Sequence, residues 1–287
     1  MNGQLRSRKA SQISLKGKIQ MIRIIDSHCH IYPDGIALKA VNAVDHFYDK
    51  LPTCHYDGTV ATLLSSGKEA GISHFIVHSV ATSPQQVSRI NQFLARSVAE
   101  SEGHFTGLGT MHPESEDLKG DLREIMALGL KGIKIHPDIQ KFPVDSPSAM
   151  RIFELCEDQG LPICVHTGDY RYDYSNPSRV ERVLKAFPRL KFIGAHFGGW
   201  SVWKEALNKL SDYPNLTVDT SSSFFWLTLD QTRELVKGYG PERVMFGTDY
   251  PFWPQKQDID HLLKLDLSDE DYEEIFWKNV TDLFHIS

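Results

Sequence analysis

The chain has 287 residues, of which 41% are hydrophobic, 10% aromatic and 24% charged, with 20 glycines and 14 prolines. This composition excludes a fibrous, low-complexity or disordered protein. The chain contains 31 Lys and Arg residues against 37 Asp and Glu residues, a formal net charge of -6. Because no basic face is indicated, we expect no nucleic-acid partner.

The cysteines indicate the redox environment. Cys29, Cys54, Cys156 and Cys164 form no C-x-x-C pair and are too sparse for a disulfide scaffold. We therefore expect a cytoplasmic protein. No apolar run approaches the roughly 20 residues that span a bilayer, so we expect no membrane partner either.

The first 20 residues carry several Lys and Arg side chains but no apolar core. Such a stretch cannot bury enough surface to offset the entropy of ordering, and it does not read as a secretory signal. We predict a flexible tail over residues 1–20 and one barrel domain over residues 21–287. The alternatives are an organelle transit peptide and a true start at Met21.

Short β-branched and aromatic runs then alternate with longer amphipathic runs. The strand candidates are Met21–Asp26, Ser73–Ser79, Phe105–Thr110, Gly132–His136, Pro162–His166, Lys191–His196, Leu216–Thr220 and Arg243–Thr248. The helix candidates are Val60–Ala70, Pro84–Ser101, Asp117–Leu128, Pro147–Gln159, Pro177–Phe187, Trp200–Leu210, Thr228–Lys237 and Ile259–Leu265. Eight such strand and helix pairs predict an α/β fold, a single-domain (β/α)8 TIM barrel.

Two segments lie outside this alternation. The stretch Ile31–Gly58 interrupts the chain after the first strand, on the face where the loops of such barrels build active sites. We predict that it is a lid-like insertion. The last helix, Asp269–Trp277, and the tail Lys278–Ile286 are expected to pack on the outside of the barrel.

The segment IIDSHCHIYP leads the first strand into His28 and His30. Side chains two residues apart on a strand face the same way and can converge on one ion, while Cys29 points to the opposite face. Taken alone, the H-x-H pattern is a weak signal of metal binding. The pattern indicates a metal site only in combination with polar residues at the ends of other strands.

Three further polar side chains follow later strands: His166 in CVHTG, His196 in GAHFGG and Asp249 in GTDYP. Imidazole and carboxylate ligands suit one divalent ion, most of all Zn²⁺, which activates water at neutral pH. We expect His28, His30, His166 and Asp249 to hold the ion. His196 is then the general acid or base, or the group that holds the developing oxyanion, and Asp249 shares the role of base.

These motifs resemble those of the amidohydrolase superfamily, in the branch of aminocarboxymuconate-semialdehyde decarboxylase and other amidohydrolase-2-type TIM-barrel enzymes. The resemblance runs from about Met21 to the end and includes the segment KNVTDLF. It implies a metal-dependent enzyme with the same four ligands and the same acid or base residue. In dinuclear relatives, a carboxylated lysine on the fourth strand bridges two metals. Lys134 stands at that place, so a second metal is an alternative.

Other residues near the strand ends are candidates for binding substrate. Lys134 and His136 share one face of the fourth strand, and we favour Lys134 as a positive charge that pairs with a carboxylate. Arg171 has the planar fork that binds a carboxylate. Trp200 and Trp226 are expected to enclose a flat substrate. His46 and His55 in the insertion are expected to be exposed.

The function that we favour from the sequence is hydrolysis of an amide, lactone or ester of a small carboxylate-bearing compound by metal-activated water. The first alternative is non-oxidative decarboxylation, because it needs the same ligands. The second is a metal-free barrel that only binds a small molecule. Whether the protein forms a homo-oligomer is left open.

Overall fold

The computed structural model describes residues 23–50 and 53–286, so the predicted tail over residues 1–20 lies outside the described residues. The strands are β1 (Ile25–His30), β2 (His74–His78), β3 (Phe105–Gly107), β4 (Gly109–Thr110), β5 (Ile133–Ile135), β6 (Ile163–Val165), β7 (Phe192–Gly194), β8 (Leu216–Asp219) and β9 (Val244–Met245). Neighbouring strands pair in parallel, in the orders β1-β2-β3 and β4-β5-β6-β7-β8-β9. Because only Leu108 separates β3 from β4, these segments correspond to the eight predicted strands.

Backbone hydrogen bonds also join the two groups of strands at both seams. At one seam, the Leu108 N–H donates to the carbonyl of Val77 at 2.9 Å. At the other, the Ser27 N–H donates to the carbonyl of Phe246 at 2.8 Å, and the Asp249 N–H donates to the carbonyl of His28 at 2.9 Å. The strands therefore form a continuous ring, and the predicted α/β barrel is confirmed.

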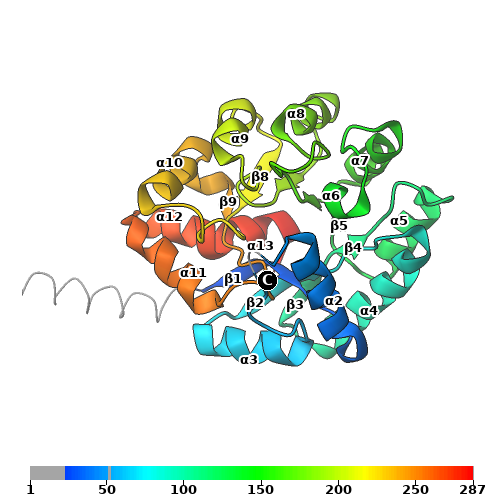
Figure 1. Cartoon of the computed structure of the whole chain (residues 1–287), viewed down its shortest axis with the longest axis horizontal. Coiled ribbons are helices and arrows are strands. Elements are labelled where there is room, and N and C mark those ends of the chain that lie inside the picture. The colour runs from blue at the N-terminus through cyan, green and yellow to red at the C-terminus, as the bar shows by residue number, and fades with distance from the viewer. Residues whose placement is uncertain (1–22, 51–52, 287) are drawn as a thin grey trace, which may run out of the picture.

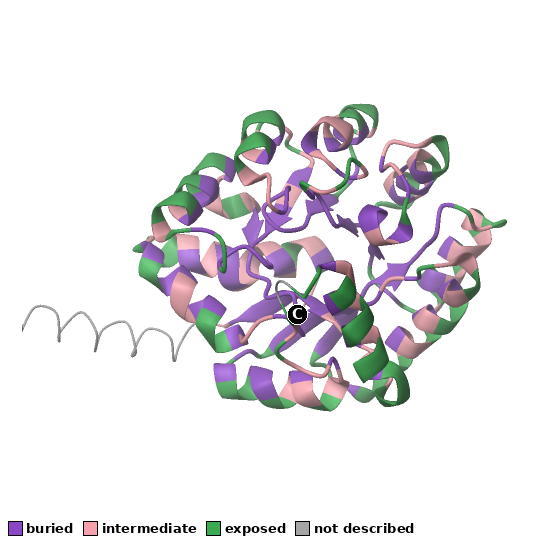
Figure 2. Cartoon of the chain, viewed as in Figure 1, coloured by how far each residue is buried: buried purple, intermediate pink, exposed green. Residues whose placement is uncertain are grey.

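Helices surround the strands (Figure 1), and each helix is buried mainly on the side that faces the strands and exposed on the side that faces outward (Figure 2). No helix in residues 23–50 and 53–286 is long and apolar enough to cross a bilayer. The α-helices are α2 (Asp34–Phe47), α3 (Val60–Ala70), α4 (Val87–Glu100), α5 (Leu118–Ala127), α6 (Pro137–Gln140), α7 (Pro147–Gln159), α8 (Pro177–Ala186), α9 (Trp203–Leu210), α10 (Leu229–Tyr239), α11 (Gln255–Leu262), α12 (Asp269–Glu273) and α13 (Asn279–Phe284). The 3-10 helices are η1 (Pro84–Gln86), η2 (Pro241–Arg243) and η3 (Leu263–Leu265), and η4 (Glu274–Lys278) is a π-helix.

Local capping explains why α3 and α7 have the bounds that the sequence predicts. Thr59 and Ser146 are their N-cap residues, and each side chain accepts a hydrogen bond from a backbone N–H of the first turn. At the other ends, Gly71 and Gly160 take left-handed φ values of 82° and 64°. Glycine adopts this conformation without the steric cost of a Cβ atom, so both helices end there.

The first strand begins later than predicted. The sequence suggested Met21–Asp26, whereas β1 covers Ile25–His30 and pairs with β2 from Ile25 opposite His74 to His30 opposite His78. Its register shifts between Asp26 and Cys29. Because the pairing extends to the end of β2, the two histidines belong to the strand itself.

The insertion after the first strand contains a helix that the sequence analysis did not predict. Helix α2 buries Ala37, Val41 and Asp45, which recur every four residues along one face. Immediately after the helix, Tyr48 packs in one cluster with Trp200 and Phe252. The insertion therefore lies over the ends of the strands, and the motion that a lid requires stays a prediction.

Two final segments were predicted to pack on the outside of the barrel. Tyr272 and Ile275 of the first segment, Asp269–Trp277, lie in the outer core cluster with residues of the surrounding helices, whereas the prediction was wrong for Lys278–Ile286. Val280 and Phe284 of α13 are buried in a cluster with the inward-facing Ile25, Ile76 and Leu108. The Asn279 amide donates to the carbonyl of Val244 at 2.8 Å, at the start of β9. Helix α13 thus covers the amino-terminal end of the barrel, where an apolar interior would otherwise meet solvent.

Candidate functional site

His28 and His30 of β1 and Asp249 after β9 meet at the carboxyl-terminal end of the barrel. The Oδ1 atom of Asp249 lies 3.5 Å from Nε2 of His28 and 3.4 Å from Nε2 of His30. Ligands of one tetrahedral ion at 2.0–2.2 Å are about 3.4 Å from one another. Both distances from Asp249 to the histidines therefore match those between ligands of one divalent metal ion.

Asp219 holds the opposite side of the His28 ring. Its Oδ2 atom lies 2.9 Å from Nδ1 of His28, and its Oδ1 atom accepts hydrogen bonds from the backbone N–H groups of His196 and Ser221 at 3.0 and 3.1 Å. Metal-binding histidines commonly have such a carboxylate partner, which leaves the other nitrogen free for the ion. Burial lowers the pKa of His28 well below its usual value, which favours the neutral, metal-binding form.

His166 and His196 are directly hydrogen-bonded to each other. Nε2 of His196 lies 2.9 Å from Nδ1 of His166. Nε2 of His166 donates to the carbonyl of Gly168 at 3.1 Å, and Nδ1 of His196 lies 2.9 Å from Oγ of Ser221. In this structure, both nitrogens of His166 therefore have protein partners.

His166, His196 and Asp249 line one pocket, together with Tyr48, Trp200, Ser222 and Phe252. His196 and Asp249 have left-handed φ values of 60° and 66°. Residues with such strained backbone conformations are found most often at functional sites. Burial raises the pKa of Asp249 to about 7 and lowers the pKa of His196 to about 4. Strained backbone and shifted pKa values at one pocket mark it as the candidate active site.

Lys134 of β5 is fully buried, next to the candidate metal site. Its Nζ lies 3.2 Å from Nε2 of His28 and 3.6 Å from Sγ of Cys164. The ammonium group thus contacts the same nitrogen that faces Asp249. Carboxylation of Lys134, a second metal, and pairing of Lys134 with a substrate carboxylate stay predictions.

His136 stands behind His166, and the two rings stack with centroids 3.8 Å apart. Its Nε2 lies 3.1 Å from the Tyr48 hydroxyl, and its Nδ1 accepts from the Ile139 N–H at 3.2 Å. One carboxylate oxygen of Asp138 is 3.9 Å from Nε2 of His166. His136 therefore supports the pocket wall from behind, and direct contact with substrate stays a prediction.

Arg171 already has partners within the protein. Its guanidinium donates to Oδ2 of Asp169 and to the carbonyl of Phe47, both at 2.7 Å. It also lies 4.9 Å from the ring centroid of Tyr48 and 5.6 Å from that of Trp200. These contacts attach the end of α2 to the barrel, so the structure does not present Arg171 as a free carboxylate-binding group.

The two predicted tryptophans differ in position. Trp200 is buried and lines the pocket. Trp226 is half exposed and packs edge-on against Phe225. His46 and His55 are exposed, as the sequence analysis expected.

The sequence analysis did not single out His78, Asp219 or Tyr48. His78 ends β2, and its ring lies 4.6 Å from that of His28 and 4.4 Å from that of His30. Asp219 ends β8. Both could have been found in the same way as His166, as polar residues at the carboxyl ends of predicted parallel strands. Tyr48 follows a helix that was not predicted, so it had no such signal.

The profile of the amidohydrolase family matches residues 25–286 of this chain. Among curated proteins, the 2-amino-3-carboxymuconate-6-semialdehyde decarboxylase of Dictyostelium discoideum is 27% identical over 57% of this chain and 55% of that protein. The match thus spans only about half the length of this relative. These findings confirm the resemblance that the motifs indicated.

Several solved structures share the fold. An uncharacterized TIM-barrel protein from Bordetella bronchiseptica has a TM-score of 0.77 and 21% identity, and the match covers 92% of this chain and 99% of that one. The 5-carboxyvanillate decarboxylase of Sphingomonas paucimobilis has a TM-score of 0.71 and 18% identity, with 93% and 100% covered. A dihydroxybenzoic acid decarboxylase from Polaromonas sp. JS666, which holds manganese and the inhibitor 2-nitroresorcinol, has a TM-score of 0.70 and 17% identity, with 92% and 97% covered.

Proposed function

The chain belongs to the amidohydrolase family, and we propose that it is a metal-dependent decarboxylase that removes CO2 from a small aromatic or unsaturated carboxylate. The residue pattern alone favours hydrolysis of an amide, lactone or ester. Decarboxylation takes precedence because the curated relative and two of the structural neighbours named above are decarboxylases. Both reactions use the same set of ligands.

The observation that carries the proposal is the spacing of Asp249 from His28 and His30, at 3.5 and 3.4 Å. These three residues would hold one divalent ion, and His166 would join them as a further ligand once its Nδ1 atom releases the hydrogen bond to His196. The donor set suits zinc, while the neighbour from Polaromonas holds manganese. When bound, the ion supplies positive charge that orients a negatively charged substrate and stabilises charge that develops during the reaction.

The residues of the pocket supply the remaining chemistry. Tyr48, Trp200 and Phe252 form one aromatic cluster at the pocket, and flat apolar walls of this kind bind a planar substrate and exclude water. In the reaction, the bond between the substrate carbon and its carboxylate breaks, CO2 leaves, and the electron pair stays on the carbon. His196 relays a proton from solvent to this carbon, giving one up and taking another.

A product analysis tests the proposal. The purified, metal-loaded protein is incubated with hydroxybenzoates and unsaturated carboxylates in D2O, and in parallel with lactones, amides and esters. We expect released CO2 and one deuterium atom at the carbon that lost its carboxylate. Hydrolysis products without CO2 would restore the hydrolase alternative. Equal activity before and after removal of the metal by a chelator would contradict any metal-dependent reaction.

A further inference from the structure

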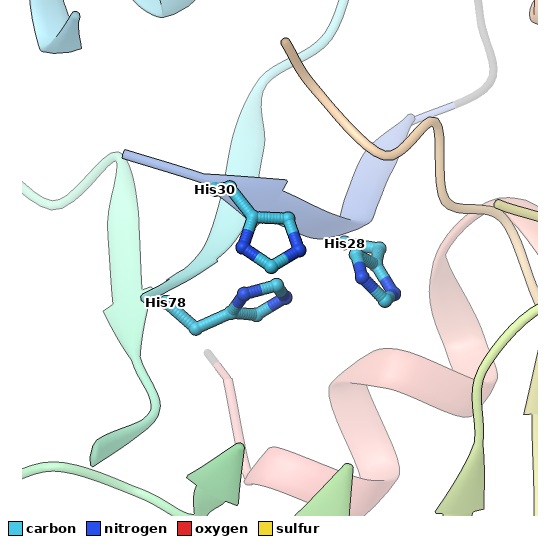
Figure 3. Close-up of side chains that lie close together, drawn as sticks. All are labelled: His28, His30 and His78. Carbon is cyan, nitrogen blue, oxygen red and sulfur yellow. The ribbon is translucent and has the colours of Figure 1, made fainter. Parts of the chain in front are cut away.

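His78 stands beside the two metal-site histidines without a role in the site described so far. Its partner across the pairing of β1 and β2 is His30. Figure 3 shows the ring of His78 beside that of His30, with His28 next to both. The rings of His78 and His30 are nearly perpendicular, at 87°, and the His78 residue is fully buried.

Neither ring nitrogen of His78 has a hydrogen-bond partner among the residues that the structure describes. A neutral imidazole carries one N–H donor and one lone pair, and burying either without a partner is unfavourable. His74, at the other end of the same strand, has both nitrogens bonded, to the carbonyl of Gly103 at 3.0 Å and to Oγ1 of Thr106 at 2.9 Å. The lack of partners at His78 therefore needs a specific explanation.

The position of the His78 nitrogens supplies one. His28, His30 and His78 each offer one nitrogen, and these three atoms all lie within 4.8 Å of one another. Lys134 Nζ lies 3.2 Å from Nε2 of His28, but no donor among the described residues reaches either nitrogen of His78. A transition-metal ion accepts several such lone pairs at once.

We propose that His78 is an additional imidazole ligand of the divalent ion that His28 and His30 bind. The inference rests on the proposed function only in that it needs an ion at this place. A further imidazole favours zinc over manganese, because nitrogen ligands suit zinc whereas manganese prefers carboxylate and water oxygens. His78 therefore also sets the metal preference of the site.

The test compares metal binding by His78→Phe and His78→Asn with that of the wild-type protein. His74→Asn is the matched control, because it changes a buried histidine of the same strand at the other end of the barrel. Each chelator-stripped protein is titrated with Zn²⁺ alone and with Mn²⁺ alone, in competition with a chromophoric chelator. Circular dichroism checks that each variant is folded.

Loss of His78 should weaken Zn²⁺ binding by about 100-fold or more, since even residues beyond the ligand shell contribute about 10–100-fold. Mn²⁺ binding should fall by a smaller factor, and His74→Asn should leave both affinities unchanged. Electron spin echo spectroscopy of the Cu²⁺-loaded proteins should count one coordinated imidazole fewer in His78→Phe than in the wild type.

Unchanged Zn²⁺ affinity in folded His78→Phe and His78→Asn, with an unchanged imidazole count, would overturn the inference and leave His78 as a packing residue. A wild-type protein that binds neither ion would overturn it too. A wild-type protein that binds Zn²⁺ through His78 but releases no CO2 from any carboxylate would support the ligand and contradict only the decarboxylase. The two proposals thus fail separately.

Discussion

Asp219 and His28 are bonded through Oδ2 and Nδ1 at 2.9 Å, on the side of the imidazole opposite the nitrogen that faces Asp249. Both side chains are about 1% exposed, so little water competes for this bond. The pair comes from β8 and β1, which are separated in the ring by β9 alone. The carboxylate therefore fixes the orientation of a candidate ligand two strands away.

Replacing this carboxylate should weaken metal binding without removing a ligand. Asp219→Asn keeps the shape of the side chain but loses the charge that orients His28. We expect Zn²⁺ affinity to fall by about 10–100-fold, the usual contribution of such a partner, as measured by competition with a chelator. Asp212→Asn, an exposed change ahead of the same strand, is the control. Equal affinities in the two variants would argue against the orienting role.

Metal binding and proton transfer should separate at the hydrogen-bonded pair of His166 and His196. We expect His196→Asn to keep the bound metal and to lose turnover by about 10²–10⁴-fold, the usual contribution of a positioned acid or base. His166→Ala should lose both metal and turnover. Metal content by elemental analysis and kcat on the same samples check this. Loss of metal from His196→Asn would instead make His196 a ligand.

The fold could be predicted from the sequence wherever a short segment determines its own secondary structure. The β-branched runs identify every strand, and the caps at Thr59 and Ser146 set the starts of two helices. Helix α2 was missed although Ala37 and Val41 show its periodicity, because the whole insertion was interpreted as a loop. The position of α13 depends on which apolar surface is left open once the ring closes, and no local pattern encodes that.

The candidate site was predictable to the extent that strand ends determine it. The rule that parallel strands end at one face of a barrel predicts from the sequence alone that His28, His30, His166, His196 and Asp249 lie together. The rule could not reveal which of the candidate side chains already form hydrogen bonds with other residues of the protein. The partners of Arg171 come from the same loop and from α2, which were not placed relative to each other in the sequence analysis.

The buried carboxyl group of Asp258 in α11 should make stability depend on pH. Burial raises its pKa well above the usual value, and the negative charges of Asp26 and Asp249 add to this shift. The folded protein therefore holds this proton more tightly than the unfolded chain. The stabilising contribution is complete below about pH 4, the unfolded pKa, and is lost as the pH rises through the raised value.

Asp258→Asn should remove this dependence. At pH 8 we expect the free energy of unfolding to increase by about 1 kcal/mol or more, the equivalent of roughly one pKa unit. At pH 5 the gain should be smaller. Urea unfolding at both values measures it, and Asp260→Asn on the same helix, whose side chain is 46% exposed, is the control. A gain that does not grow with pH would contradict the assignment.

Removing the Phe284 side chain should destabilise the barrel from the end opposite to the active site. Phe284 is 5% exposed and packs with Ile25 and Leu108 inside the ring. Phe284→Ala should lower the free energy of unfolding by about 3–5 kcal/mol, through lost burial and the cavity left behind. Asp282→Ala, exposed on the same helix, should change it by less than about 0.5 kcal/mol. Because the metal site lies at the other end of the strands, folded Phe284→Ala should keep its Zn²⁺ affinity, and a marked loss of affinity would show that α13 also shapes the site.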